Sequence, residues 1–135
     1  MSAAFTIATS GMTAATRRLE VSADNVANMS TNGPMPDASA SNPTRFPAAY
    51  VPLRVDQVDV AGGTAARVTT DSPSYVPTYD PAAPYADKGG MVAAANVDLA
   101  NEAVQQITAL YTFAANAKVM QAESRMMRTL LDIKV

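Results

Sequence analysis

Apolar and small residues recur along residues 5–29 at alternating steps of three and four. Large side chains alternate with mostly small ones in the series Phe5, Ala8, Met12, Ala15, Leu19, Ser22, Val26 and Met29. This spacing is typical of a helix with one continuous apolar seam. It predicts a helix over residues 5–29, roughly 37 Å long at the usual rise per residue. Gly33 and Pro34 are its predicted C-terminal stop.

A second pattern of the same kind runs along the last part of the chain. One row contains Leu110, Phe113, Ala117, Met120, Ser124, Met127 and Leu131, and another contains Ala115, Val119, Ala122, Met126, Leu130 and Ile133. Asp98 is placed to cap the helix start, and Glu102 suits the positive end of its dipole. The two rows offer more apolar surface than one partner helix covers. This surface fits either a wide core-facing stripe in a monomer or packing between subunits, and the short proline-rich middle favours the second.

The middle of the chain contains all nine prolines, between Pro34 and Pro84, which excludes a long helix there. Alternation from residue 51 to 60 predicts a strand, with a bulge where the phase breaks at residues 56 and 57. Gly62 and Gly63 predict a hairpin turn before a strand over residues 65–70. Residues 73–84 read as an extended passage poor in hydrogen bonds, and residues 38–42 as a mobile segment. The predicted segments are therefore 1–33, 34–97 and 98–135.

Composition excludes several classes of protein. The 135 residues carry a net charge of −2, with no Cys and no His. This disfavours nucleic-acid binding and removes thiol nucleophiles, Ser-His and Cys-His pairs and nearly every zinc or iron site. The first residues lack both the basic start of a secretory signal and an apolar run long enough for a bilayer. We therefore expect no cofactor, no direct membrane insertion and no cleaved signal peptide.

The densest polar cluster, YDPAAPYADKGG, spans residues 79–90. Asp80 and Asp87 could form a carboxylate pair or a calcium loop, but their spacing does not match an EF-hand loop. A solvated, turn-rich loop accounts for every residue in the cluster. The sequence therefore favours a loop over a catalytic or metal site.

Asn25 and Asn28 face the same side of the first predicted helix, one turn apart. Buried against another helix, their amides would need hydrogen-bond partners and would fix the register between the packed helices. Asparagine is also common at fraying helix ends. The residues alone leave these two interpretations open.

The stretch SGMTAATRRLEVSADNVANMSTNGP, residues 10–34, is similar to the N-terminal signature of bacterial flagellar rod, hook and hook-associated axial proteins. The matching residues are Ser10, Gly11, Arg18, Leu19, Asn25, Ala27, Asn28 and Thr31. Residues 75–135 resemble the C-terminal half of proximal-rod members of this family. They contain YDPxxPxAD, a glycine before Asn-Val-Asp, an aromatic-x-Ala-Asn and a Met-Met pair. Met91, Ala95 and Arg125 depart from the family pattern.

The resemblance implies an α+β fold, in which long N- and C-terminal helices form an antiparallel coiled-coil-like stem with a small β-rich, proline-rich middle. It also implies a non-enzymatic structural subunit of the proximal rod that transmits torque across the periplasm and is exported uncleaved by the flagellar type III apparatus. The implied partners are other copies of the chain, other rod proteins, the membrane-ring and export-gate base of the basal body, and the export apparatus. For Asn25 and Asn28, it favours a role in packing and register between helices.

From the seams and the resemblance together, we expect an assembly interface on both terminal helices. Its residues are Met12, Leu19, Asn25, Val26, Asn28, Leu110, Phe113, Asn116, Met120, Met126, Met127 and Leu131.

Two hypotheses from other functional classes compete with this one. The first is a small β-module that binds carbohydrate or peptide on a platform of Tyr75, Tyr79 and Tyr85. The second is a carboxylate-dependent hydrolase that uses Asp80 and Asp87. The first predicts a folded monomer that loses its ligand in Tyr variants, and the second requires a pocket.

Overall fold

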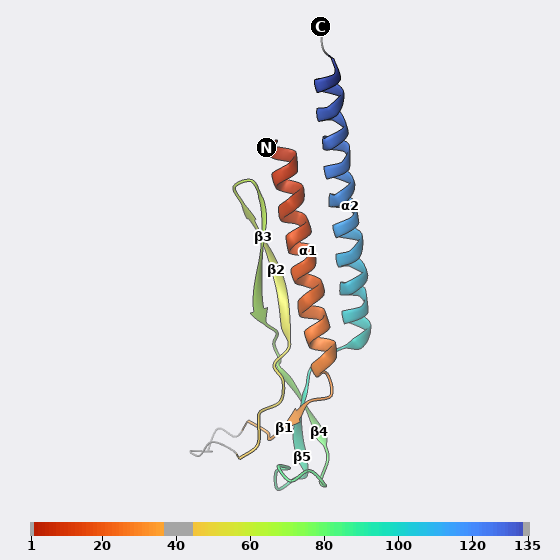
Figure 1. The fold of residues 1–135 in the computed structure, drawn as a ribbon. Helices are drawn as coiled ribbons and strands as arrows, with labels where there is room; N and C mark the ends of the chain where they lie inside the picture. Colours follow the sequence, from red (N-terminus) through yellow and green to blue (C-terminus); the bar gives the residue numbers. More distant parts are fainter. Residues whose placement is uncertain (1, 37–44, 134–135) are drawn as a thin grey trace.

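The computed structural model describes residues 2–36 and 45–133, so the predicted mobile segment 38–42 lies outside the described residues. The described part is an α+β structure of two long helices and five strands. The two helices run antiparallel, side by side, and α2 extends past the N-terminal end of α1 (Figure 1). This confirms the α+β class and both predicted helices.

Helix α1 spans Ala3–Asn28 and begins at the N-cap Ser2, whose Oγ accepts a hydrogen bond from the Phe5 amide at 3.3 Å. The predicted stop at Gly33 and Pro34 is wrong. The helix ends at Asn28, whose carbonyl accepts from both the amide and the hydroxyl of Thr31. These bonds turn the chain into a short strand, β1 (Asn32–Gly33).

Helix α2 spans Leu99–Asp132 and starts at the predicted cap. The Asp98 carboxylate accepts from the amide of Ala100 at 2.9 Å and from that of Asn101 at 3.5 Å. Glu102 lies in the first turn, where the positive end of the helix dipole favours a carboxylate.

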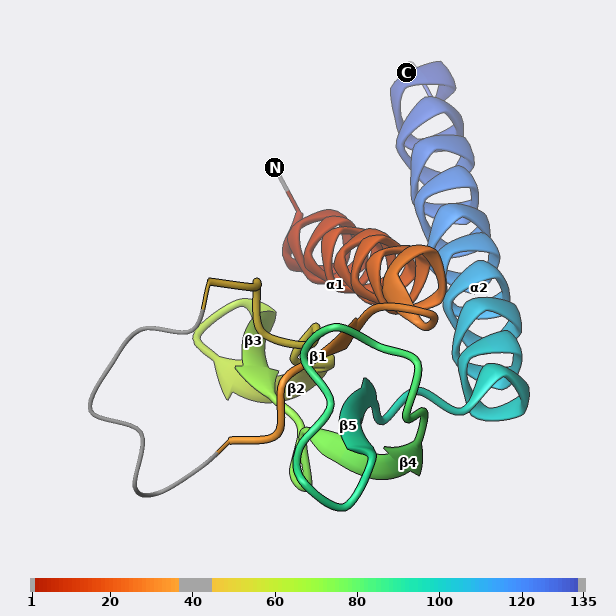
Figure 2. The same ribbon diagram turned by 90° about the horizontal axis from the view of Figure 1, so that it is seen from below.

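Strands β2 (Leu53–Val60) and β3 (Gly63–Thr70) form an antiparallel hairpin that packs along α1. Figure 2 shows α1 between this hairpin and α2. The predicted bulge at residues 56 and 57 is wrong, because the register runs unbroken from Leu53 opposite Thr70 to Val60 opposite Gly63. The predicted turn is confirmed, with Gly62 at a φ of +90°.

A second small sheet lies below the helices, with the order β1, β5 (Met91–Ala95), β4 (Tyr75–Tyr79). The passage predicted to be poor in hydrogen bonds therefore contains a strand. Pro77 fits in β4 because β4 is an edge strand, where one side of the backbone needs no ladder partner. The Ser72–Pro73 peptide bond is cis.

The core is built mainly from small side chains. The buried apolar residues of the described part are Ala8, Ala14, Ala15, Val21, Val92, Ala93 and Ala109. Small residues let helix and strand backbones approach closely, but each buries little apolar area. Most of the large apolar side chains of α2 therefore remain at the surface of the single chain.

Candidate assembly interface

Asn25 joins three parts of the structure. Its side chain is 2% exposed. The Asn25 Nδ2 donates to the Leu53 carbonyl and to Glu102 Oε1, both at 2.7 Å. Its Oδ1 accepts from the Leu53 amide at 2.9 Å and from the Tyr50 hydroxyl at 3.0 Å. One amide therefore fixes α1 to the start of the hairpin and to the first turn of α2, within a single chain.

Asn28 has a different role from Asn25. Its Nδ2 donates to the Asp24 carbonyl of its own helix at 2.9 Å, and its carbonyl accepts from Thr31. It is half-buried and helps to end α1. Of the two asparagine side chains, only that of Asn25 makes hydrogen bonds to another element in the described part of the chain, so each of the two open interpretations fits one residue.

Tyr50 lies beside the same joint. Burial raises the pKa of its phenol, and the negative charges of Asp24 and Glu102 raise that pKa further. The neutral phenol is therefore the form that donates to Asn25.

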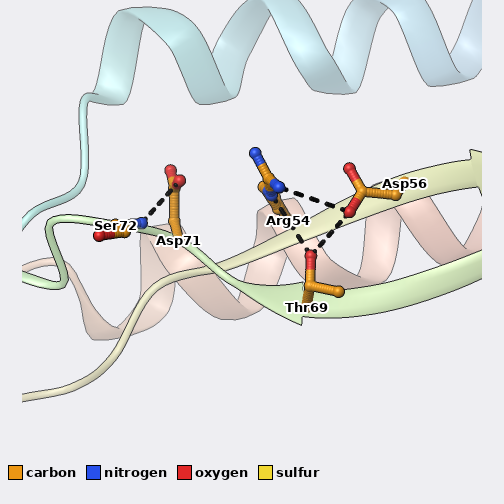
Figure 3. A network of polar contacts seen from close by, with 5 residues as sticks. All are labelled: Arg54, Asp56, Thr69, Asp71 and Ser72. Carbon is orange, nitrogen blue, oxygen red and sulfur yellow. Dashed lines mark hydrogen bonds and ion pairs between the residues drawn. The ribbon is translucent and has the colours of Figure 1, made fainter.

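A small polar cavity of about 90 Å³ lies next to Asn25, between the hairpin base and the start of α2. Its polar lining includes Arg18, Ser22, Arg54, Asp71 and Glu102. Figure 3 shows the hairpin side of this region, where Arg54 and Asp71 point to the same side of the ribbon. Thr69 accepts from Arg54 at 3.3 Å and donates to Asp56 at 2.9 Å, so these side chains brace the base of the hairpin.

The Ser-Gly pair near the start of α1 contacts both neighbouring elements. Ser10 Oγ accepts from the Thr64 amide at 3.1 Å, which holds the hairpin tip against α1. A Cβ on Gly11 would lie 2.7 Å from Asn116 Nδ2, so glycine leaves the space that the Asn116 side chain occupies. Both helices thus approach closely at Gly11 and Asn116.

The small and the large members of the α1 seam lie at different depths. Its small members Ala8, Ala15 and Ser22 are buried, and Ser22 Oγ donates to the Glu102 carbonyl of α2 at 3.2 Å. The large members Met12, Leu19 and Val26 are only half-buried. Small residues therefore form the closest contact with α2, and the large ones flank it.

The predicted residues of α2 lie mostly at the surface. Asn116 and Met120 are half-buried, whereas Leu110, Phe113, Met126, Met127 and Leu131 are exposed. Leu131 is 78% exposed. Among the described residues of α2, only Ala109 is buried.

Further exposed apolar residues of α2 did not enter the predicted interface. They are Leu99, Val104, Ile107, Tyr111, Val119, Leu130 and Ile133. Three of them belong to the second apolar row of the sequence, and that row was the signal from which they could have been included. The others lie in the first half of α2, where neither row predicts an exposed face.

Asp80 and Asp87 shape the loop between β4 and β5. Asp80 Oδ1 accepts from the Ala82 amide at 3.2 Å, and Asp87 Oδ1 accepts from the amides of Gly89 and Met91 at 2.7 and 2.8 Å. These are the turn bonds that Asp side chains commonly make. The described residues contain no group of three or more His, Cys, Asp or Glu side chains that could hold a metal ion.

The three tyrosines of the predicted binding platform pack against different neighbours. Tyr75 lines a hollow with Pro34 and Ala93, Tyr79 lies over Gly90, and the Tyr85 ring centroid is 5.5 Å from that of Phe46. The positions of the three tyrosines therefore give no support to a shared platform for carbohydrate or peptide.

Within residues 2–36 and 45–133, neither helix combines the length and apolar character needed to span a bilayer.

Comparison with known proteins matches both ends of the chain to flagellar families. Residues 5–34 match the flagella basal body rod protein family, and residues 88–133 match the C-terminal family of flagellar basal body rod FlgEFG proteins. The flagellar basal-body rod protein FlgC of Borreliella burgdorferi is 30% identical over 142 aligned residues, which cover 94% of this chain and 93% of the relative. The chain belongs to the FlgC family.

Other FlgC relatives match over a similar span. FlgC of Yersinia enterocolitica is 33% identical over 128 residues and FlgC of Salmonella typhimurium is 34% identical over 134 residues. Each alignment covers 93% of this chain and 92% of the relative. The contacts of Ser10, Gly11 and Asn25 fall in the first family match, and Asn116 falls in the second. The hairpin lies between the two matched regions.

Proposed function

We propose that this chain is a non-enzymatic structural subunit of the proximal rod of the bacterial flagellar basal body. In this role it packs with other copies and with other rod proteins in a helical assembly that crosses the periplasm and transmits torque. The two helices form the coiled-coil-like stem within the predicted segments 1–33 and 98–135, and the predicted segment 34–97 is the outer part. Its further partners are the membrane-ring and export-gate base of the basal body and the flagellar export apparatus.

The observation that carries the proposal is the exposed apolar surface of α2. A row of large side chains from Leu99 to Ile133 lies at the surface of the single chain, while the one buried residue of α2 in the described part is Ala109. Burying a large apolar side chain contributes about 1.5–3 kcal/mol. Association that covers several of them therefore supplies a strong driving force, as a repeating assembly requires. The FlgC relatives are flagellar basal-body rod proteins, which supports the rod as this assembly.

The proposal includes export by the flagellar type III apparatus without cleavage. Its support is membership of the FlgC family. The exported chain then has the same mass as the chain inside the cell.

Gene deletion and complementation in the source bacterium test the proposal. We expect the deletion strain to lack complete basal bodies and motility, and the intact gene to restore both. Isolated basal bodies should contain the chain at the same mass as it has in cell extracts, and cells without a working export apparatus should retain it inside. Complete, rotating flagella in the deletion strain would refute the structural role. Export in cells without the apparatus would refute that part alone.

A further inference from the structure

Helix α2 continues beyond the part of α1 that it contacts. The Thr9 hydroxyl of α1 lies 4.0 Å from Met120 Sδ of α2. From this level α1 runs only about two turns more, to Ala3, whereas α2 runs more than three turns, to Asp132. The last two turns of α2 therefore lie past the end of α1, as Figure 1 shows. We define residues 126–133 as the α2 overhang.

The side of α2 that contacts α1 continues into the α2 overhang. There it has no partner helix in its own chain. Ala109, Asn116 and Met120 lie on the side of α2 that faces α1. Met127 and Leu131 follow at the same steps of seven and four, so they fall on the same stripe. All five large apolar residues of the overhang are exposed: Met126, Met127, Leu130, Leu131 and Ile133. The stripe thus continues the α1–α2 interface where α1 is no longer present.

The same chain contains an apolar groove between its two helices. It is lined by Ala15, Thr16, Leu19, Ala109, Leu110 and Phe113, and its volume is about 190 Å³. We call it the stem groove. An apolar cavity of about 150 Å³ can hold a benzene molecule, so the stem groove has room for one leucine side chain. Its floor consists of the buried Ala15 and Ala109, while Leu110 and Phe113 are exposed at its rim.

Charged side chains of both signs lie beside the stem groove and on the α2 overhang. Glu20 lies one helical turn after Thr16 at the rim of the stem groove, and its carboxylate is exposed in a pair with Arg17. Arg128 lies one turn before Leu131 on the α2 overhang and is exposed. A leucine of the overhang that enters the groove therefore brings Arg128 toward the existing Arg17–Glu20 pair.

We propose that the α2 overhang of one copy of this chain packs in the stem groove of a second copy, with Leu131 between Leu110 and Phe113. The inference rests on the proposed assembly role and names the surfaces that meet. The two surfaces lie on different parts of the stem, so the contact is head-to-tail and repeats from copy to copy. A contact of this kind builds an open helical assembly or a closed ring.

Disulfide cross-linking tests the contact, because the natural chain has no cysteine. The double variant Thr16→Cys/Arg128→Cys places one thiol beside the groove and one beside Leu131, and it leaves the apolar side chains intact. Thr16 lines the groove with Leu110, and position 128 lies on the order of 25–30 Å further along α2. A disulfide needs Cα atoms within about 7 Å, so the two thiols cannot join within one chain.

We expect mild oxidation to link copies of the double variant into a ladder of dimers, trimers and larger species. The purified chain at high concentration and isolated basal bodies should both give this ladder. Each single variant has one thiol and stops at dimers. The matched control Thr16→Cys/Lys118→Cys, which moves the second thiol to another exposed basic position of α2, should give no ladder. Adding Leu131→Asp to the cross-linking variant should remove the ladder.

Three results would overturn the inference. The first is the absence of a ladder both in basal bodies that contain the chain and in the concentrated solution. This result would not contradict the proposed rod function. Another is a cross-link from position 128 to a different rod protein in place of a second copy. The third is an equal ladder in the Lys118 control. Absence of the chain from basal bodies together with a ladder in solution would instead count against the proposed function alone.

Discussion

Asn25 and Leu53 are joined by a reciprocal pair of hydrogen bonds. The Asn25 Nδ2 donates to the Leu53 carbonyl at 2.7 Å, and the Leu53 amide donates to Asn25 Oδ1 at 2.9 Å. A side-chain amide has the same donor and acceptor as a peptide group. Asn25 therefore acts as a strand partner for the first residue of β2. Because it also donates to Glu102, it sets the position of the hairpin relative to both helices.

The first prediction separates the two asparagines. Asn25→Ala removes the partners of Leu53, Tyr50 and Glu102 at a buried position, and each buried polar group left unpaired costs about 1–3 kcal/mol. We expect a large fall in the midpoint of thermal unfolding, followed by circular dichroism. Asn28→Ala loses only a bond to its own helix and gains helix propensity, so we expect a change within about 0.5 kcal/mol.

In the control Arg17→Ala, an exposed ion pair is lost and little stability should change. Equal effects of Asn25→Ala and Asn28→Ala would show that the contacts of Asn25 do not determine the position of the hairpin.

The second prediction concerns the pH dependence that Tyr50 introduces. Its folded-state pKa is raised above the ordinary value of about 10, first by burial and then by Asp24 and Glu102. Above pH 10 the unfolded chain therefore releases this proton more readily than the folded chain. Stability contributed by the neutral phenol is fully present below about pH 10 and falls as the pH rises through the folded-state pKa.

Tyr50→Phe isolates this contribution from the other four tyrosines. We expect the variant to lose about 0.5–1.5 kcal/mol at neutral pH, since one hydrogen bond to Asn25 is gone. Between pH 10 and pH 12 its urea midpoint should fall less steeply than that of the natural chain. Parallel curves for the two proteins would exclude Tyr50 as the cause.

The helices could be predicted from the sequence, but the small sheet could not. The steps of three and four and the cap at Asp98 are local signals, and the structure confirms both helices. Strand β5 contains mostly alanine, and β4 contains Pro77, so neither has a strong strand propensity. They form strands because β5 lies between β1 and β4 and pairs with both. That neighbourhood depends on contacts distant in the sequence.

The predicted bulge failed for a related reason. Alternation fixes a strand only where one face is buried. Most residues of β2 are half-buried or exposed, so the phase break at Asp56 and Gln57 has no effect on the pairing. A break in pattern at the surface is therefore weak evidence for a bulge.

The candidate interface was predictable as a set of surfaces but not as individual contacts. A seam of alternating large and small residues does not say which members meet the nearest helix. In α1 it is the small ones, Ala8, Ala15 and Ser22, and this leaves Leu19 beside a groove. Likewise, the spacing of Asn25 and Asn28 could not show that only Asn25 bonds to the hairpin, because the sequence of the helix does not determine where the hairpin packs.

The third prediction uses the close approach at Gly33. A Cβ at this position would collide with the backbone of Ala48 and Ala49, and β1 would have to leave its place beside β5. We expect Gly33→Ala to destabilise the small sheet by about 1–3 kcal/mol or more, since the obstacle is backbone and cannot rotate away. The measurement is amide exchange at Ala93, which lies opposite Gly33, and at Ala95, whose amide donates to the Thr31 carbonyl at 3.2 Å.

Gly89→Ala is the matched control. The nearest atom to its added Cβ is Asp87 Oδ1 at 3.2 Å, a side-chain atom in an exposed loop. Its effect should be small. Unchanged protection of β5 in Gly33→Ala would mean that residues 47–49 do not press on Gly33 in solution.

The last prediction concerns Leu19, which is half-buried at the stem groove. In a single chain, Leu19→Asp places a carboxylate where it still reaches water, so the fold should survive with a modest loss. In the assembled rod the same carboxylate would be buried without a partner, which costs several kcal/mol. We therefore expect near-normal secretion of the variant, no completed rods and no motility.

Thr13→Asp introduces the same charge at an exposed position of α1 and should leave assembly intact. Secretion is measured in the culture medium, assembly by electron microscopy of isolated basal bodies, and folding by circular dichroism of the purified chain. Normal rods that contain Leu19→Asp would show that the stem groove stays open to water in the assembly. Failure of both Asp variants would point to net charge as the cause.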